Sequence, residues 1–152
     1  MISDEFRLAR YSDLTRYLDA QKNTYATALS ELRSGKKLSH WIWYVFPQLR
    51  RLGHSYNSDY YGLMGLAEAR EYLAHALLGD RLREATEAML NHQFLDANSV
   101  LGELDALKFR SCLTLFSIAA PSEQIFADAL ERLFDGERDV RTVGLLKTRG
   151  DT

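Results

Sequence analysis

A run of basic and aromatic residues lies between Glu31 and Asp59, where the sequence has no acidic residue. Five basic side chains give this segment a local charge of +5: Arg33, Lys36, Lys37, Arg50 and Arg51. Aromatic and hydrogen-bonding residues alternate with them: Trp41, Trp43, Tyr44, Phe46 and Tyr56, with His40, Gln48, His54 and Ser55. Cations hold phosphate through charge-assisted hydrogen bonds, and aromatic faces stack on planar rings. The segment is therefore suited to an anionic, planar ligand.

We predict that this segment binds an anionic, nucleotide-like small molecule. Its ring system would stack on Trp41 or Trp43. His40 is the candidate acid–base catalyst, because histidine is the side chain whose ordinary pKa lies nearest neutral pH. The phosphate would contact three basic side chains: Lys37, Arg50 and Arg51. Further polar residues would orient the ligand or a water molecule: Gln21, Gln48, Ser55, Asp105, Lys108 and Ser111.

Two other interpretations of the segment are open at this point. In the first, both tryptophans belong to the core and the five cations only keep a loop in contact with solvent. In the second, the protein is a non-enzymatic interaction module whose basic aromatic loop binds an acidic protein partner or RNA. The whole chain has a net charge of −2, so the residues outside the segment carry −7, which argues against a long nucleic-acid track. No pattern indicates an oligomeric state.

The histidines and the single cysteine give little indication of a metal centre or a nucleophilic site. No two of the four histidines are spaced to share one helical turn. The single cysteine, Cys112, lies on an apolar helical stripe, which indicates a buried thiol rather than a nucleophile. The sequence also has no phosphate-binding glycine loop and no zinc-protease motif. We therefore predict no metal and no cofactor.

Apolar residues recur at helical spacing over residues 14–32. Gln21 occupies a core-facing position of this stripe, between Leu18 and Tyr25. A buried amide without partners costs about 1–3 kcal/mol. We predict that Gln21 is largely buried and that its amide lies within hydrogen-bonding reach of the segment His40–Ser55. The alternative is a boundary residue that bonds a neighbouring loop.

The composition is that of a globular protein, with 46% hydrophobic and 26% charged residues among 152. The segment His40–Phe46 is apolar on every side and is the one place where the pattern also fits a strand. Gly35, Gly79 and Gly136 are expected to end helices. Apolar residues recur at helical spacing over six stretches: 14–32, 66–76, 78–89, 105–116, 121–133 and 139–146. We predict an all-α, compact single-domain bundle of about six to seven helices.

No shift of composition divides the chain, so a single domain over residues 1–152 is expected, with a polar, frayed tail at 147–152. The longest apolar runs are far shorter than the roughly 18 residues that cross a bilayer, and the first residues do not resemble a signal peptide. We therefore expect a soluble, cytoplasmic protein that does not bind membranes.

Several motifs of the sequence resemble one uncharacterised family. The most specific is the block His40–Gln48, which reads His-Trp-x-Trp followed by Phe-Pro-Gln, with Gly53 and Ser55 after it. Matches to the family are spread over nearly the whole chain and include Gln21, Tyr61, His75, Gly102, Asp105, Lys108, Ser111 and Phe116. On these residues the sequence resembles DUF1810, a domain of unknown function in bacteria and some eukaryotes. The resemblance implies a largely helical fold.

The sequence departs from the family pattern at Ile42, Ala76 and Cys112, where methionine, proline and a second serine are common. Cys112 lacks a strong hydroxyl, so no catalytic role is expected there. Members of the family sometimes carry the label calpastatin. That calpain inhibitor is a largely disordered chain, whereas the apolar stripes here predict a packed core, so the label does not fit. A more distant likeness, without a shared motif, is to helical domains that process ADP-ribose-type nucleotides. It implies NAD- or ADP-ribose-type hydrolase or transferase chemistry.

Overall fold

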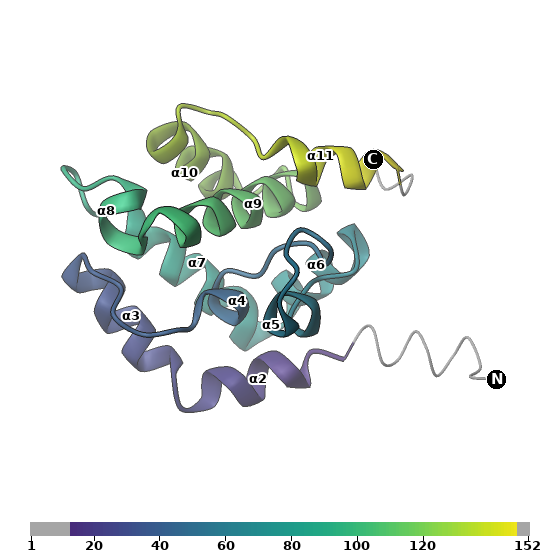
Figure 1. Cartoon of the computed structure of the whole chain (residues 1–152), viewed down its shortest axis with the longest axis horizontal. Helices are drawn as coiled ribbons and strands as arrows, with labels where there is room; N and C mark the ends of the chain where they lie inside the picture. The colour runs from purple at the N-terminus through teal and green to yellow at the C-terminus, as the bar shows by residue number, and fades with distance from the viewer. Residues whose placement is uncertain (1–12, 149–152) are drawn as a thin grey trace.

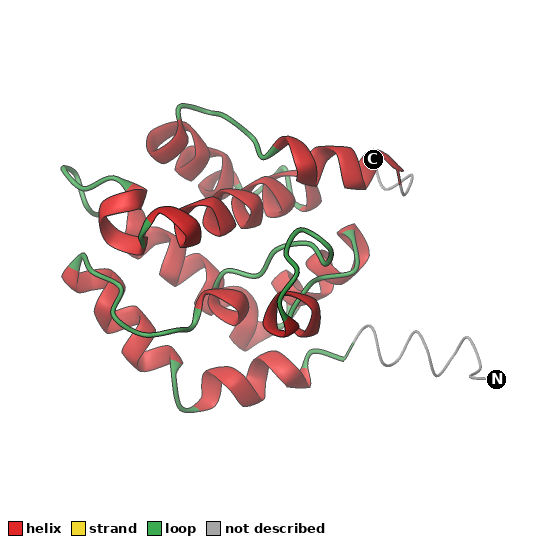
Figure 2. Cartoon of the chain, viewed as in Figure 1, coloured by secondary structure: helices red, strands yellow, loops and turns green. Residues whose placement is uncertain are grey.

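The computed structural model describes residues 13–148, and every regular element in this range is a helix. The one β-bridge within it is an isolated contact between Leu49 and Leu63, and otherwise only loops connect the helices (Figure 2). The predicted all-α fold is confirmed. The helices are α2 (Thr15–Lys22), α3 (Tyr25–Ser34), α4 (Ile42–Val45), α5 (Tyr56–Tyr60), α6 (Leu66–Ala74), α7 (Ala76–Leu90), α8 (Ala97–Leu101), α9 (Glu103–Ala119), α10 (Gln124–Phe134) and α11 (Val140–Thr148).

Helix α9 is the main packing partner in the fold, with α6, α8, α10 and α11 against it (Figure 1). Its predicted apolar stripe is confirmed, since Phe109, Cys112, Leu113 and Phe116 are all 0% exposed. Helices α2 and α3 lie along the opposite edge of the molecule (Figure 1). The short α4 contacts both α2 and α9, so it joins the two parts through the core.

The stretch predicted as one helix, 14–32, is two helices in the structure. α2 ends at Lys22 and α3 begins at Tyr25, so Asn23 and Thr24 interrupt the expected continuous face. The Thr24 hydroxyl donates to the carbonyl oxygen of Ala20, and side chains of this kind compete with the helical bonds of the backbone. The predicted end at Gly35 is confirmed, because this glycine takes a left-handed φ of 87°.

The break between α6 and α7 falls at His75 and not at Gly79 as predicted. The His75 ring nitrogen accepts hydrogen bonds from the backbone N–H groups of Leu77 and Leu78, so it caps α7. Gly79 lies inside α7, where a Cβ atom would stand 2.0 Å from the carbonyl oxygen of Leu73. Glycine therefore permits close packing between two helices at this position and does not end one.

The segment that also fitted a strand contains one helical turn, α4. Pro47 follows Phe46, and its ring disfavours a helical backbone at the preceding residue. Helices α4, α5 and α8 have only four or five residues, too few to show a 3.6-residue repeat. For this reason, and because the stretch 14–32 is two helices, the described residues contain ten helices where about six to seven were predicted. Of the predicted frayed tail, Lys147 and Thr148 belong to α11, and 149–152 lie outside the described residues.

The carboxylate of Glu31, on α3, holds the loop that leads into α4. One oxygen accepts hydrogen bonds from the backbone N–H groups of Leu38 and Ser39 and from the indole N–H of Trp41, at 2.8–3.0 Å. The other accepts from the Ser39 hydroxyl at 2.7 Å. Burial acts to raise the pKa of Glu31, but these hydrogen bonds outweigh it and lower the pKa to about 2. Trp41 is only 1% exposed, so this carboxylate satisfies a buried donor.

We expect Glu31→Gln to lower the free energy of unfolding at pH 7 by about 1–2 kcal/mol, because an amide accepts these hydrogen bonds more weakly than a carboxylate. The pKa of Glu31 is lower in the folded than in the unfolded protein, so its contribution is complete above about pH 4.5. The difference between the two proteins should therefore shrink as the pH falls from about 4.5 to about 2. Urea unfolding across this range measures it.

Glu87→Gln is the matched control, since Glu87 is exposed on α7. It should leave the free energy of unfolding within about 0.5 kcal/mol of the parent value. Equal losses for the two variants, or a Glu31→Gln difference that does not change with pH, would contradict the role given to Glu31.

Candidate functional site

Three of the predicted site residues, Trp43, Gln48 and Lys108, line one small cavity. Trp43 comes from α4, Gln48 from the loop after it, and Lys108 from α9. The cavity has a volume of about 10 Å³, which is room for about one water molecule. Its other lining residues are Ile42, Phe46, Asn57, Ser58, Tyr61 and Gly62. We call it the Gln48 cavity.

Gln48 is 7% exposed as a residue, and no described residue forms a hydrogen bond with its amide, whose atoms keep a small contact with solvent. Its backbone is fixed, because the Gln48 carbonyl oxygen accepts from the N–H of Leu63 at 2.9 Å. The cavity in front of the amide is the place where a water molecule or a ligand group can satisfy it.

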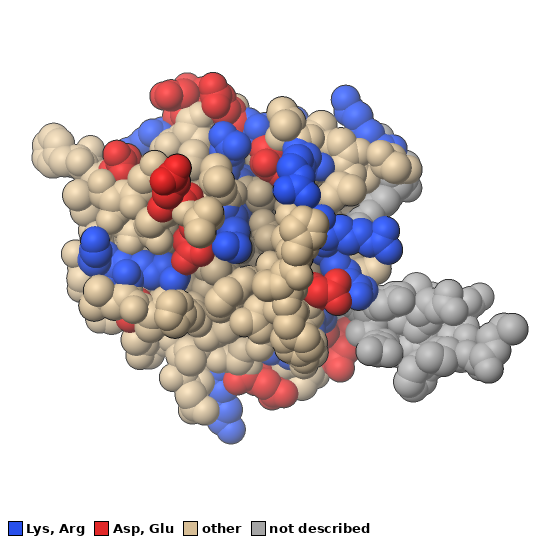
Figure 3. Space-filling view, in the orientation of Figure 1, with Lys and Arg blue, Asp and Glu red and all other residues tan. Residues whose placement is uncertain are grey.

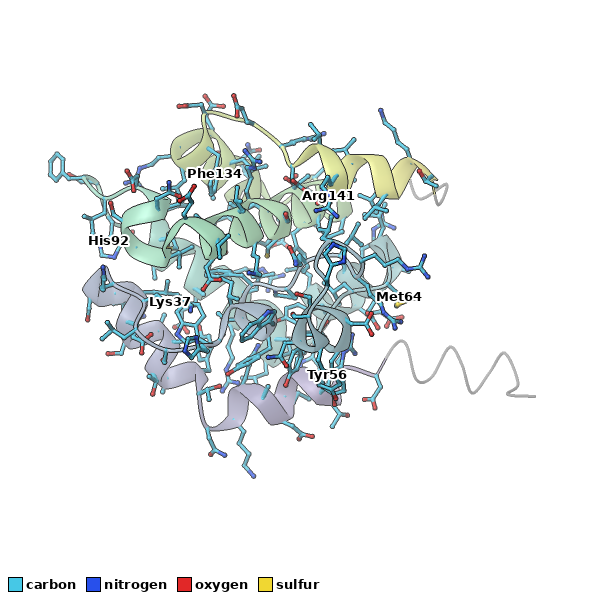
Figure 4. All side chains as sticks on the ribbon, viewed as in Figure 1. Lys37, Tyr56, Met64, His92, Phe134 and Arg141 are labelled. Atoms are coloured by element: carbon cyan, nitrogen blue, oxygen red, sulfur yellow. The ribbon has the colours of Figure 1, made fainter. Side chains whose placement is uncertain are left out.

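Next to the cavity, Asp105 lies between two lysines. Its Oδ2 is 2.7 Å from Nζ of Lys37, whose side chain is only 7% exposed, and its Oδ1 is 3.5 Å from Nζ of Lys108. Lys37 also lies over the Trp41 ring, 5.0 Å from its centroid, between α3 and the start of α9 (Figure 4). Lys37 is therefore held firmly and Lys108 loosely. An aspartate at the start of an apolar stripe favours Asp105 as a helix N-cap, but α9 begins at Glu103, so Asp105 stands in its first turn.

Three other predicted site residues form local contacts and do not line the Gln48 cavity. Arg50 forms two hydrogen bonds with the Asp59 carboxylate, at 2.7 and 3.0 Å, and they lower the pKa of Asp59. The Ser55 hydroxyl accepts from the N–H of Ser58 and caps α5. The Ser111 hydroxyl donates to the carbonyl oxygen of Leu107 within α9. Each has a structural partner that the sequence did not reveal.

The two tryptophans have different surroundings. Trp41 is buried with its indole N–H bonded to Glu31, so its faces are unavailable for stacking. For this residue the interpretation as a core aromatic is the correct one. Trp43 is partly buried and lies at the edge of the core. His40 is exposed and does not line the Gln48 cavity.

The basic segment does not form a uniformly positive surface. Lys37 pairs with Asp105, Arg50 with Asp59, and Arg33 approaches Glu84 at 3.7 Å. In Figure 3, basic and acidic side chains are mixed over the visible face, with a broad area of neither kind in its middle. Acidic residues outside the segment thus neutralise three of its five cations.

A much larger cavity, of about 560 Å³, lies between the start of α2 and α5 and contains no predicted residue except Arg50. Arg16 also lines it, but its guanidinium already donates to the carbonyl oxygens of Asp13, Tyr60 and Gly62 and to the Glu68 carboxylate. Because both arginines are engaged, this cleft offers a phosphate few free donors. Its other lining residues are Asp13, Thr15, Asp19, Asp59, Tyr60, Gly62 and Met64.

The described residues also bear on metal ligands, a reactive thiol and membrane-spanning helices. Among residues 13–148 no group of three His, Cys, Asp or Glu side chains could hold a metal ion. Cys112 is fully buried, and burial raises its thiol pKa well above the ordinary value, which disfavours the reactive thiolate. None of the helices described has the length and apolar character needed to cross a membrane.

The model of a protein family of unknown function, DUF1810, matches residues 11–146. The chain belongs to this family. Among solved structures, it is similar to the crystal structure of the conserved hypothetical protein Rv1873 from Mycobacterium tuberculosis, with a TM-score of 0.87. The two chains are 43% identical, and the match covers 89% of this chain and 96% of that one. No curated protein matches. The DUF1810 resemblance seen in the motifs is confirmed, and neither comparison supplies an activity.

Sequence reasoning missed several residues of this DUF1810 chain that shape the site. In the sequence, Glu31 only marked the start of the basic segment. In the structure, its carboxylate accepts a hydrogen bond from Trp41 of that segment. Asn57 belongs to a polar cluster, 57–59, whose composition favours a loop, but it stands on α5 and lines the Gln48 cavity. Tyr61 was one of the residues that match the family, and this match was the only sequence signal for its place at the cavity. No sequence signal singled out Arg16, which lines the larger cleft and not the Gln48 cavity.

The prediction for Gln21 is confirmed. Its side chain is 1% exposed, and its amide nitrogen donates to the carbonyl oxygen of Tyr44 at 2.7 Å and to the Tyr72 hydroxyl at 3.1 Å. Its amide oxygen accepts from Arg81 at 3.2 Å. All of the amide is thus used inside the protein. Gln21 fixes α4 and does not line the Gln48 cavity.

We expect Gln21→Leu to lower the free energy of unfolding by about 1–3 kcal/mol, because the substitution removes the best partner of a buried carbonyl group. Urea unfolding measures the change, with Gln124→Leu as the control, since Gln124 is exposed on α10. The control should change it by less than about 0.5 kcal/mol. A Gln21→Leu protein as stable as the parent would show that these three hydrogen bonds contribute nothing.

Proposed function

We propose that this protein binds an anionic, nucleotide-like small molecule at the Gln48 cavity. The observation that carries the proposal is Gln48: the residue is 7% exposed, its amide has no hydrogen-bond partner among the described residues, and it lines a cavity beside a lysine and a tryptophan. Few polar groups that converge on an otherwise apolar pocket are typical of small-molecule sites. Here the apolar part comes from Ile42 and Phe46.

Three kinds of group support this ligand chemistry. The Lys108 ammonium is loosely paired and can exchange its 3.5 Å contact with Asp105 for a phosphate or carboxylate oxygen. The amides of Gln48 and Asn57 each offer a donor and an acceptor, which match the edge of a heterocyclic base. The partly buried ring of Trp43 offers a stacking surface.

The size of the cavity limits how such a ligand can bind. About 10 Å³ holds one water molecule and not a ring. We therefore place one polar group of the ligand inside, at Gln48, and the ring outside against Trp43. The anionic group then lies toward Lys108. The proposal is one of binding, and a catalytic role for His40 stays a prediction from the sequence.

The proposal is tested by isothermal titration of the purified protein with adenosine, guanosine, cytidine and uridine monophosphates and nicotinamide mononucleotide. We expect saturable binding of at least one of them. Lys108→Ala and Gln48→Leu should each weaken it at least tenfold, about 1.4 kcal/mol. Trp43→Ala should cost about 1–3 kcal/mol of binding free energy through lost stacking.

Lys22→Ala is the control, because Lys22 is exposed at the end of α2 and its removal takes away the same charge. It should bind as the parent does. Thermal unfolding of each variant separates loss of binding from loss of fold. No binding of any of these compounds at millimolar concentration, or binding that Lys108→Ala and Gln48→Leu leave unchanged, would refute the proposal.

A further inference from the structure

The loop between α7 and α8, residues 91–96, projects from one edge of the molecule (Figure 1). Phe94 within it is 95% exposed, and its neighbour Leu95 is 39% exposed. Removing a large apolar side chain from water is favourable, and among the described residues Phe94 is the most exposed side chain of this kind. Neither residue lines the Gln48 cavity.

This loop is held at both ends, so the exposure of Phe94 does not come from a loosely attached segment. The Arg132 guanidinium, on α10, donates to the carbonyl oxygens of Leu90 and His92. The His92 ring donates to the carbonyl oxygen of Leu32 at 2.5 Å. At the other end, the Asp96 carboxylate accepts from the N–H of Ser99 and caps α8. The loop therefore presents Phe94 on a fixed base.

A hollow of about 220 Å³ has Phe94 itself among its lining residues. Leu95 and Leu133 also contribute to its apolar part, and Asp96 and Arg132 contribute one charge of each sign. A projecting aromatic side chain and a hollow are thus adjacent on the same surface, which we call the Phe94 face. In a two-fold interface each copy presents the same patch to the other, so one patch that carries both a projection and a hollow can be self-complementary.

We propose that the Phe94 face is a two-fold interface between two copies of this chain. The Phe94 ring of each copy enters the hollow of the other, against Leu95 and Leu133. Arg132 of each copy, which uses two of its five N–H groups on Leu90 and His92, then offers the remaining ones to Asp96 of the other. Charges of both signs within one patch complement an identical patch better than they complement a partner of a single charge.

The patch is small, so the association is weak. Interfaces that bury less than about 1,200 Å² in total belong to transient complexes. Dissociation constants in the micromolar range are therefore expected, with most of the binding free energy from the buried aromatic side chain.

Sedimentation equilibrium between about 5 and about 500 μM tests the proposal, since this range brackets such an affinity. We expect the mean mass to rise from the 17.4 kDa of one chain toward twice that value. Phe94→Ala should weaken the association at least tenfold, with an unchanged circular dichroism spectrum. Val140→Ala removes a similarly exposed side chain, 80% exposed on α11, and should associate as the parent does.

Three results would overturn the proposal. The first is a mass of one chain throughout the concentration range. The second is association that Phe94→Ala does not weaken, which would place the interface on another face. The third is an equal loss in Phe94→Ala and Val140→Ala, which would show that any exposed apolar side chain contributes.

Discussion

Four hydrogen bonds converge on the carboxylate of Glu31, and the position of α4 depends on them. They fix the loop 38–41 and with it the buried indole of Trp41. From the other side, Gln21 bonds the carbonyl oxygen of Tyr44 near the end of α4. Because α4 packs against both α2 and α9, these two polar side chains align the two parts of the core.

The hydrogen bonds from Glu31 and Gln21 are needed because α4 is a single turn. So short a helix is unstable in water on its own, since nucleation costs more than one hydrogen bond returns. Its backbone groups must find tertiary partners, as the Tyr44 carbonyl oxygen does in Gln21. Phe46 then packs on Phe109 with ring centroids 4.4 Å apart. Trp43 within the turn and Gln48 just after it are therefore set by contacts made elsewhere in the chain.

The charge of the basic segment also depends on contacts made elsewhere in the chain. Seen along the chain, the residues from Arg33 to Arg51 form a basic run. In the fold, acidic groups of α5 and α9 neutralise much of it, and Lys37 is nearly buried against Asp105. Lys108 lies outside that run, and it is the cation that lines the Gln48 cavity. A local charge count reports composition, whereas the field at a site depends on which partners the fold brings near.

The sequence by itself determined the helical class and the main apolar faces, because the 3.6-residue repeat of α9 or α10 is a local property. It also indicated that Gln21 would be buried, since an amide on an apolar stripe faces the core. Only the tertiary structure decided which polar groups meet. It brought Gln48 to Lys108, removed Trp41 from the surface, and placed the break of α6 at the capping ring of His75. These outcomes depend on contacts between residues far apart in the chain, and no local pattern records such contacts.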